Sequence, residues 1–195
     1  MSGKFLRVSK VGGSLFDFAD LPTALRCWLD DQPGANVLIA GGGPFAEAVR
    51  EADRVYSLGD SNSHLLAIEA MSVSAKLLLA LLPESRLVHS LEEIPCTVAA
   101  HKIAVLDPVS LLTSPECRLP RSWDVTSDSI AAFAATELGA HELVLFKSAH
   151  LPPNMRRAEA AEKGFVDGHF VRSALEIQTV RWVNLRVAPV TERPL

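Results

Sequence analysis

The sequence predicts an α/β protein, a three-layer αβα sandwich with a mostly parallel central sheet. Apolar strand segments alternate with helix segments along the chain, which is the pattern of parallel strands joined by crossover helices. Two glycine-rich turns, at residues 12–14 and 41–43, directly follow apolar strands. The 195 residues are 48% hydrophobic and 22% charged, which is enough for one sizeable core.

The first third of the chain contains two buried strands, each followed by a helix. Phe5 to Val11 and Asn36 to Ala40 are apolar runs of strand length. Between them, Leu21 to Asp31 places apolar residues at helical spacing and ends before a Pro-Gly pair. Pro44 suits the first turn of a second helix, which runs to about Tyr56.

The middle of the chain carries the longest expected helix. Asp60 or Ser61 caps this helix, which continues through about Leu82 and stops at the following proline. Arg86 to Ser90 is a short strand candidate, and Lys102 to Leu106 is a further apolar strand.

The last third repeats the alternation. Thr126 or Ser127 caps a helix from Asp128 to Leu138, and Gly139 suits the position just after its end. The remaining expected elements are a strand from Glu142 to Phe146, a short helix from Arg156 to Lys163 and a last strand from Thr179 to Val187.

Composition excludes several classes of function. The net charge of −4 and the pI near 5.9 argue against nucleic acid as a partner, because proteins that bind phosphate backbones usually carry a basic face. Three widely spaced cysteines, without a CxxC pair, are expected to be free thiols in a reducing cytosol. The longest apolar run, Leu77 to Leu82, is too short to span a bilayer. A cytoplasmic soluble protein with no membrane partner and no dedicated metal site is therefore expected.

The two glycine turns are the strongest candidates for a binding site. Glycine lets backbone N–H groups approach an anion, and a helix that starts just after the turn adds its positive dipole end. Lys10 precedes the first turn, so the site would hold several phosphate or carboxylate oxygens. A plain strand-to-helix turn and a relaxed dinucleotide-binding motif are the alternatives. The candidate phosphate-binding residues are Gly12, Gly13, Ser14, Gly41, Gly42 and Gly43.

Three further residues lie near expected strand or helix ends, where ligands of open α/β sheets bind. Asp128 opens a helix, where it serves either as part of a simple cap or to orient lysines. Lys147 follows a buried strand, so its ammonium group must reach solvent or a partner. His64 either contacts an acceptor or has a structural role, and the sequence favours neither.

Taken in order, these pieces resemble the amino acid kinase family, which includes acetylglutamate, aspartate, carbamate and uridylate kinases. The resemblance runs from about Val8 to Arg172, with Lys10–Ser14 similar to the first phosphate loop and Ile39–Gly43 similar to the second glycine turn. The resemblance implies that Lys10 is catalytic and that Asp128 organises the catalytic lysines. It also implies that Arg172 takes the place of the second phosphate-binding lysine.

The segment Phe146–Leu151 departs from the family, which often has Thr-Asp-Val-Asp-Gly where the nucleotide binds. Lys147 is expected to contact nucleotide phosphates there, together with Asp167 and Gly168 from the segment that precedes Arg172. The resemblance implies one domain, residues 1–195, with an acceptor half of about 1–120 and a reduced nucleotide half of about 121–195.

Two segments, at residues 61–64 and 123–128, resemble a short branch of the family that acts in the synthesis of methanofuran, a one-carbon cofactor. The branch implies transfer of the γ-phosphoryl group of ATP, with Mg²⁺, to a phosphate group such as that of aminomethylfuran methyl phosphate. A uridylate-type kinase and a non-catalytic anion- or nucleotide-binding protein are the alternatives. A homo-oligomer, a dimer or larger, is also expected, although burial within the monomer explains the apolar helix from Ser63 to Leu82 equally well.

Overall fold

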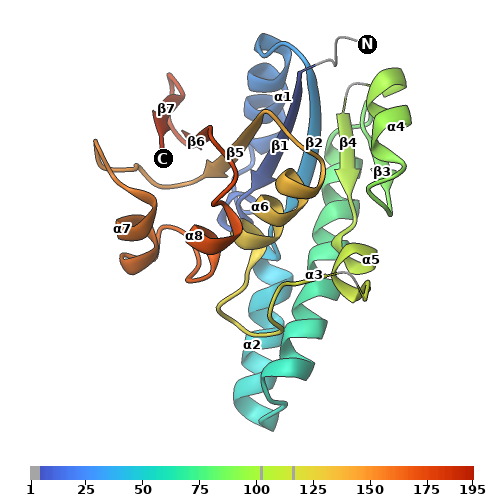
Figure 1. Cartoon of the computed structure of the whole chain (residues 1–195), viewed down its shortest axis with the longest axis vertical. Coiled ribbons are helices and arrows are strands. Elements are labelled where there is room, and N and C mark those ends of the chain that lie inside the picture. The colour runs from blue at the N-terminus through green and yellow to red at the C-terminus, as the bar shows by residue number, and fades with distance from the viewer. Residues whose placement is uncertain (1–4, 102, 116) are drawn as a thin grey trace.

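A computed structural model describes residues 5–101, 103–115 and 117–195. In this part of the chain, a seven-stranded sheet has the strand order β3-β4-β2-β1-β5-β6-β7 (Figure 1). Neighbouring strands from β3 to β6 are parallel, and β7 pairs with β6 in the antiparallel direction. The strands are β1 (Leu6–Val11), β2 (Ala35–Ala40), β3 (Arg86–Val88), β4 (Ile103–Leu106), β5 (Glu142–Lys147), β6 (Val180–Asn184) and β7 (Thr191–Pro194).

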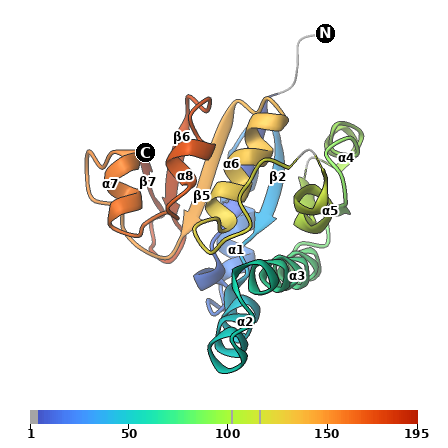
Figure 2. The same cartoon turned by 60° about the horizontal axis from the view of Figure 1, so that its bottom comes forward.

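Helices form most of the connections between the strands. A short 3₁₀ turn, η1, follows β1, and the two long helices α2 and α3 project together beyond one end of the sheet (Figures 1 and 2). The helical segments are η1 (Gly13–Leu15), α1 (Leu21–Asp31), α2 (Gly43–Tyr56), α3 (Asp60–Leu81), α4 (Ile94–His101), α5 (Pro108–Thr113), α6 (Ser127–Glu137), α7 (Arg157–Glu162) and α8 (Phe170–Ser173).

Two apolar clusters lie on opposite faces of the sheet. On one face, Leu25 of α1 shares a cluster with Val144 of β5. On the other face, Ile130 of α6 shares a cluster with Val8 of β1 and Leu145 of β5. The predicted three-layer αβα sandwich with a mostly parallel sheet is therefore confirmed.

The strands at the centre of the sheet are buried on both faces, and for this reason they read as continuous apolar runs. All six residues of β2 are buried. Strand β1 departs most from this composition, because it buries Arg7, Ser9 and Lys10 among its apolar residues. A buried charge needs a partner, and Arg7 has one in Glu142, with Nε and Oε2 2.6 Å apart. The partner of Lys10 defines the site described below.

Several elements were not predicted. Helix α5 begins after Asp107, whose carboxylate accepts a hydrogen bond from the N–H of Val109 at 3.1 Å. Strand β7 contains Pro194, which lowers strand propensity but is tolerated on an edge strand. Helices α4 and α8 are short and were also missed. The strand predicted from Lys102 begins at Ile103 in the described residues, and Lys102 itself lies outside them.

Helix α3 is long and apolar enough, by length and composition alone, to cross a membrane. In the fold, 44% of its most apolar window is buried, and α3 packs against α2, α5 and β2. A core helix of a globular protein passes the same test, so α3 is weak evidence for a membrane span. The run Leu77 to Leu82 alone is too short to cross a membrane. Helix α3 as a whole is long enough, and its other residues are also mostly apolar.

Candidate active site

The two glycine turns lie directly against each other at the carboxyl ends of β1 and β2. A Cβ atom added to Gly13 would lie 2.5 Å from the backbone nitrogen of Gly43, and one added to Gly41 would lie 2.7 Å from that of Gly13. Only glycine permits so close an approach of two backbones. The Gly12 N–H donates to the Phe146 carbonyl at 2.9 Å, which ties the first turn to β5. The structure therefore brings both predicted turns to one place.

Lys10, Asp128 and Lys147 form a buried group of three charges beside these turns, which we call the Lys-Asp-Lys cluster. Lys10 Nζ lies 3.0 Å from Asp128 Oδ1, and Lys147 Nζ lies 2.8 Å from Asp128 Oδ2. Lys10 and Asp128 are only 5% and 4% exposed. One carboxylate therefore holds two ammonium groups, one on each oxygen.

The regular geometry of the sheet brings these three side chains together. Side chains alternate between the two faces of a strand. Lys10 therefore shares a face with Val8, which packs in the α6 cluster, and Lys147 shares that face with Leu145. Strands β1 and β5 are neighbours in the sheet, and α6 presents Asp128 from its first turn. The arrangement follows from two adjacent parallel strands ending under one helix N-terminus.

The charged groups of the cluster shift one another's pKa values. Burial raises the pKa of Asp128, but the ammonium groups of Lys10 and Lys147 outweigh it, so the net shift is downward. Burial also lowers the pKa of Lys147 to about 8, against the opposing effect of the Asp128 carboxylate. Asp128 is therefore ionised at neutral pH. Lys147 loses its proton at a pH only slightly above neutral.

Two further contacts fix the Lys147 side chain. Its Nζ donates to the backbone carbonyl of Phe165 at 2.8 Å, and the same atom lies 5.0 Å from the centre of the Trp182 ring. A cation over an aromatic face is attracted by the ring quadrupole. Lys147 is thus held in one orientation by Asp128, Phe165 and Trp182, so the position of its charge is set before any ligand binds.

Asp167 caps the amino end of α6 from a distant part of the chain. Its Oδ2 accepts hydrogen bonds from the Thr126 N–H at 3.0 Å, the Thr126 hydroxyl at 2.8 Å and the Ser129 N–H at 3.0 Å. The Ser129 hydroxyl donates to Oδ1. Thr126 is the N-cap residue, but its hydroxyl bonds to Asp167 and not to the helix. Asp167 therefore orders the turn that carries Asp128.

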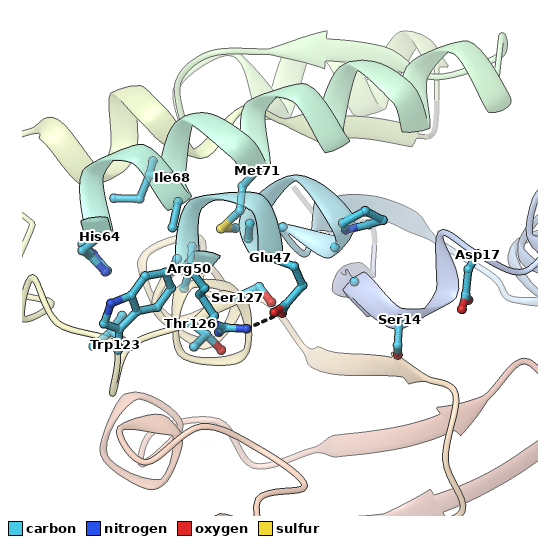
Figure 3. A pocket seen from close by; sticks show the side chains of 18 residues that line it. Ser14, Asp17, Glu47, Arg50, His64, Ile68, Met71, Trp123, Thr126 and Ser127 are labelled. Carbon is cyan, nitrogen blue, oxygen red and sulfur yellow. Dashed lines mark hydrogen bonds and ion pairs between the residues drawn. The ribbon is translucent and has the colours of Figure 1, made fainter. Parts of the chain in front are cut away.

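A cavity of about 560 Å³ opens beside the glycine turns, between α2, α3 and the segment that leads into α6 (Figure 3). Of the predicted site residues, the cavity wall includes Gly13, Ser14, Gly42, Gly43 and His64. The full lining is Gly13, Ser14, Asp17, Gly42, Gly43, Pro44, Ala46, Glu47, Arg50, His64, Ala67, Ile68, Met71, Trp123, Val125, Thr126, Ser127 and Ile130.

Two charged cavity residues, Glu47 and Arg50, were not singled out from the sequence. Glu47 and Arg50 of α2 form an ion pair, and the Arg50 guanidinium lies 4.8 Å from the centre of the Trp123 ring (Figure 3). Trp123 Nε1 in turn donates to Ser63 Oγ at 3.0 Å, which links the ring to α3. An Arg three residues after a Glu on a helix is a common surface pattern, so nothing local marked this pair as part of a cavity.

His64 lines the cavity from the first turn of α3 and is only 4% exposed. Burial lowers the pKa of His64, and the positive charge of Arg121 lowers it further. A hydrogen bond with the Ser122 backbone raises the pKa, but the net shift is downward. The imidazole is therefore neutral at pH 7 and adds no positive charge to the cavity.

Solved structures share the fold of this chain. UMP kinase from Ureaplasma parvum superposes with a TM-score of 0.70 over 96% of this chain and 93% of that protein, at 12% identity. UMP kinase from Bacillus anthracis gives 0.67 over 94% and 88%, at 9% identity. Uridylate kinase from Archaeoglobus fulgidus gives 0.55 over 78% and 69%, at 15% identity. At these identities the likeness shows the fold alone.

The sequence comparison adds a closer relative. Over 141 residues, 72% of this chain, the sequence is 30% identical to [5-(aminomethyl)furan-3-yl]methyl phosphate kinase from Methanocaldococcus jannaschii. The chain therefore has the fold of these UMP kinases and resembles this phosphate kinase in sequence. The match spans 64% of the length of that relative, and no family model matches the chain.

Arg172 does not lie with the cluster, contrary to expectation. It lies on the short helix α8 and lines a separate depression of about 250 Å³ with Thr136 and Glu137, near the carboxyl end of α6. At 1.5 Å of rise per residue, those residues are about 12 Å along the helix from Asp128. The second cation beside Asp128 is Lys147.

Gly168 also lies outside the cavity wall. A Cβ atom added to it would meet only Asp124 Oδ1, at 3.9 Å, so the position does not require glycine for space. Its neighbour Asp167 is engaged in the cap of α6. Asp167 thus has a structural role as the cap of α6. The nucleotide contacts predicted for Asp167 and Gly168 stay predictions.

The described residues contain no group of three or more His, Cys, Asp or Glu side chains arranged to hold a metal. Both oxygens of Asp128 are already paired with ammonium groups. Mg²⁺ usually keeps several waters and binds through substrate phosphates with one or two carboxylates at most. The site therefore fits a metal that arrives bound to a nucleotide, rather than one held by a protein cage.

Proposed function

We propose that the chain is a phosphotransferase that moves the γ-phosphoryl group of ATP to a small acceptor in the cavity. The observation that carries the proposal is the Lys-Asp-Lys cluster beside two glycine turns in backbone contact. Fixed positive charge and backbone N–H groups stabilise the charge that develops on a phosphoryl group in the transition state of its transfer. The kinase name of the relative from Methanocaldococcus jannaschii supports this assignment.

In this proposal each residue of the cluster has one task. Lys10 and Lys147 neutralise oxygens of the transferred group and of the donor phosphates. Asp128 holds the two ammonium groups in place, and its lowered pKa makes it a weak base. The amides of the glycine turns align donor and acceptor. Mg²⁺, when bound with ATP, neutralises charge on the donor phosphates.

The proposed acceptor group is a phosphate, as in the compound named for the relative, [5-(aminomethyl)furan-3-yl]methyl phosphate. A phosphate oxygen is already ionised at neutral pH, so it needs no general base. An alcohol acceptor would need one, and Asp128 does not offer it. The product would then be a diphosphate ester, and we propose a role in the synthesis of a one-carbon cofactor, as the resemblance to the methanofuran branch implies.

The domain organisation and the cellular location are proposed as follows. We infer one domain, residues 1–195, in which about 1–120 holds the acceptor and about 121–195 the nucleotide. Five residues of the second part, Trp123, Val125, Thr126, Ser127 and Ile130, also line the acceptor cavity. A cytoplasmic location is inferred from composition.

We also infer a homo-oligomer. None of the residues of α2, all of which are described, is buried. Val55 and Tyr56 of α2 and Leu66 and Val73 of α3 expose large apolar side chains, and a second copy would cover them. Light scattering after size exclusion measures the mass, and a monomer at micromolar concentration would refute this inference.

The proposed function is tested by ADP release from ATP·Mg²⁺ with [5-(aminomethyl)furan-3-yl]methyl phosphate or UMP as acceptor. We expect turnover with the furan phosphate, and a loss of about a hundredfold or more in Lys10→Ala. The control is Lys163→Ala, an exposed lysine paired with Glu159 outside the site. Turnover with UMP alone would favour the uridylate-type alternative. Calorimetry that detects binding of inorganic pyrophosphate but not of ATP·Mg²⁺ would favour a non-catalytic anion-binding protein.

A further inference from the structure

Glu47 lines the acceptor cavity, and its side chain is 66% exposed. In Figure 3, Ser14 of the first glycine turn lies on one side of Glu47, and His64 and Trp123 lie on the other. The Glu47 carboxylate faces the cavity from α2, with its Oε1 paired to Arg50. Among the described residues, no hydrogen bond reaches the second carboxylate oxygen, Oε2. A ligand can therefore bind this oxygen without breaking the Arg50 pair.

The charges of the cavity wall leave Glu47 available to a ligand. Asp17, the other carboxylate of the wall, is ion-paired with Arg186. Arg50 is engaged by Glu47 and by the Trp123 ring. The buried imidazole of His64 is neutral. Away from the glycine turns, Glu47 thus offers a carboxylate oxygen to a ligand, and the guanidinium of Arg50 is already partnered.

We propose that Glu47 selects an acceptor that carries a primary amine, by binding its ammonium group while the acceptor phosphate lies against the glycine turns. The inference rests on the proposed function, because it assumes that the cavity holds the phosphoryl acceptor. An ammonium group offers three N–H donors and no acceptor, so it complements a free carboxylate oxygen.

The remaining wall fits the body of such an acceptor. Ile68 and Met71 of α3 supply apolar surface, and Trp123 supplies a flat ring. A small planar ring between an amine and a phosphate would therefore find an apolar wall between a carboxylate and a set of backbone N–H groups. A pyrimidine nucleotide has no ammonium group, so Glu47 would add nothing to its binding.

The chain supplies a matched control one turn further along α2. Glu51 and Arg54 form the same Glu–Arg pair at a spacing of three residues, and their side chains are exposed like those of Glu47 and Arg50, but neither lines the cavity. Glu51→Gln removes an equivalent carboxylate from the same helix. It therefore reports any general effect of charge on α2, whereas Glu47→Gln reports the effect inside the cavity.

The experiment is calorimetric binding of two ligands, [5-(aminomethyl)furan-3-yl]methyl phosphate and its analogue with a methyl group in place of the aminomethyl group. We expect Glu47→Gln to weaken binding of the amine about tenfold and to leave binding of the methyl analogue unchanged, a size consistent with loss of a hydrogen bond to a charged group. Glu51→Gln is expected to change neither. Thermal unfolding checks that both variants fold.

Equal weakening of both ligands in Glu47→Gln, no weakening of either, or failure of the wild type to bind the amine would overturn the proposal. Its failure is separable from failure of the proposed function. Amine binding that depends on Glu47, without phosphoryl transfer from ATP, would refute the kinase activity alone. Transfer that proceeds equally well in Glu47→Gln with either ligand would refute the role of Glu47 alone.

Discussion

Lys10 and Asp128 come from opposite halves of the chain, yet Nζ of the lysine lies 3.0 Å from Oδ1 of the aspartate inside the protein. The contact joins the central strand β1 to the first turn of α6. Lys147 occupies the other carboxylate oxygen from the neighbouring strand β5. Removing one partner from a buried set of charges leaves the others uncompensated, so each member of the cluster is expected to be sensitive to substitution.

Lys147→Ala is expected to reduce turnover about a hundredfold, because it removes a fixed cation from the reacting phosphates. Arg172→Ala is expected to change turnover less than about twofold, because Arg172 lies near the far end of α6. Steady-state kinetics of both variants with ATP·Mg²⁺ measure the difference. A large loss in Arg172→Ala with a small loss in Lys147→Ala would restore the assignment made from the sequence.

Turnover is expected to fall as the pH rises through about 8, because burial lowers the pKa of Lys147 to about 8 and its charge is lost above that value. A pH–rate profile measures this alkaline limb. In Lys147→Arg the guanidinium keeps its charge, so the limb should move to higher pH even if turnover is lower throughout. An unmoved limb would show that another group titrates.

The same pKa shift gives a prediction for stability. Unfolded Lys147 returns to its ordinary pKa of 10.5, so between about 8 and 10.5 the unfolded chain binds the proton that the folded chain has lost. Unfolding then takes up a proton, and this lysine's contribution to stability rises with pH across the window. Urea unfolding of wild type and Lys147→Met at pH 7.5 and 9.5 measures it. An equal change in both proteins would contradict the prediction.

Asp167→Ala is expected to destabilise the protein by roughly 1–2 kcal/mol, the range for loss of a helix cap, because Asp167 accepts the hydrogen bonds at the start of α6. Turnover should fall as well, since Asp128 lies in the same turn. Urea unfolding and the KM for ATP separate the possible roles. A higher KM at unchanged stability would instead support the nucleotide-binding role expected from the sequence.

Gly13→Ala is expected to lower both stability and turnover, because the new Cβ would lie 2.5 Å from the Gly43 nitrogen and must push the two turns apart. An overpacked site of this kind costs about 1–3 kcal/mol. Gly168→Ala is the control, since its Cβ would meet an ordinary contact at 3.9 Å. Thermal unfolding and turnover are measured for both variants. Equal behaviour of the two would mean that the turns are not in close contact.

Much of the fold was predictable because its signals are local. The helix expected from Leu21 to Asp31 has those bounds in the structure, since periodic apolar residues and the following Pro-Gly pair define both ends. The helix predicted from Pro44 starts one residue earlier, at Gly43. The short elements α5 and β7 were missed, because α5 depends on the Asp107 cap and β7 on pairing with β6.

The site was predictable in part. Lys10, Asp128 and the glycine turns stand beside strand ends or helix starts that the sequence marks, and the structure brings them together. The pairing of Lys147 with Asp128 depends on the neighbouring positions of β1 and β5, which no local pattern records. The place of Arg172 depends likewise on how α8 packs against α6.

The sequence by itself determined the alternation of strands and helices, the glycine positions and the lysine that precedes the first turn. Those features come from hydrophobic periodicity and backbone conformation, which act over a few residues. Only the tertiary structure decided which cation pairs with Asp128, that Asp167 caps α6, and that Glu47 faces the cavity. These outcomes depend on strand order and helix packing, which join residues that are far apart along the chain.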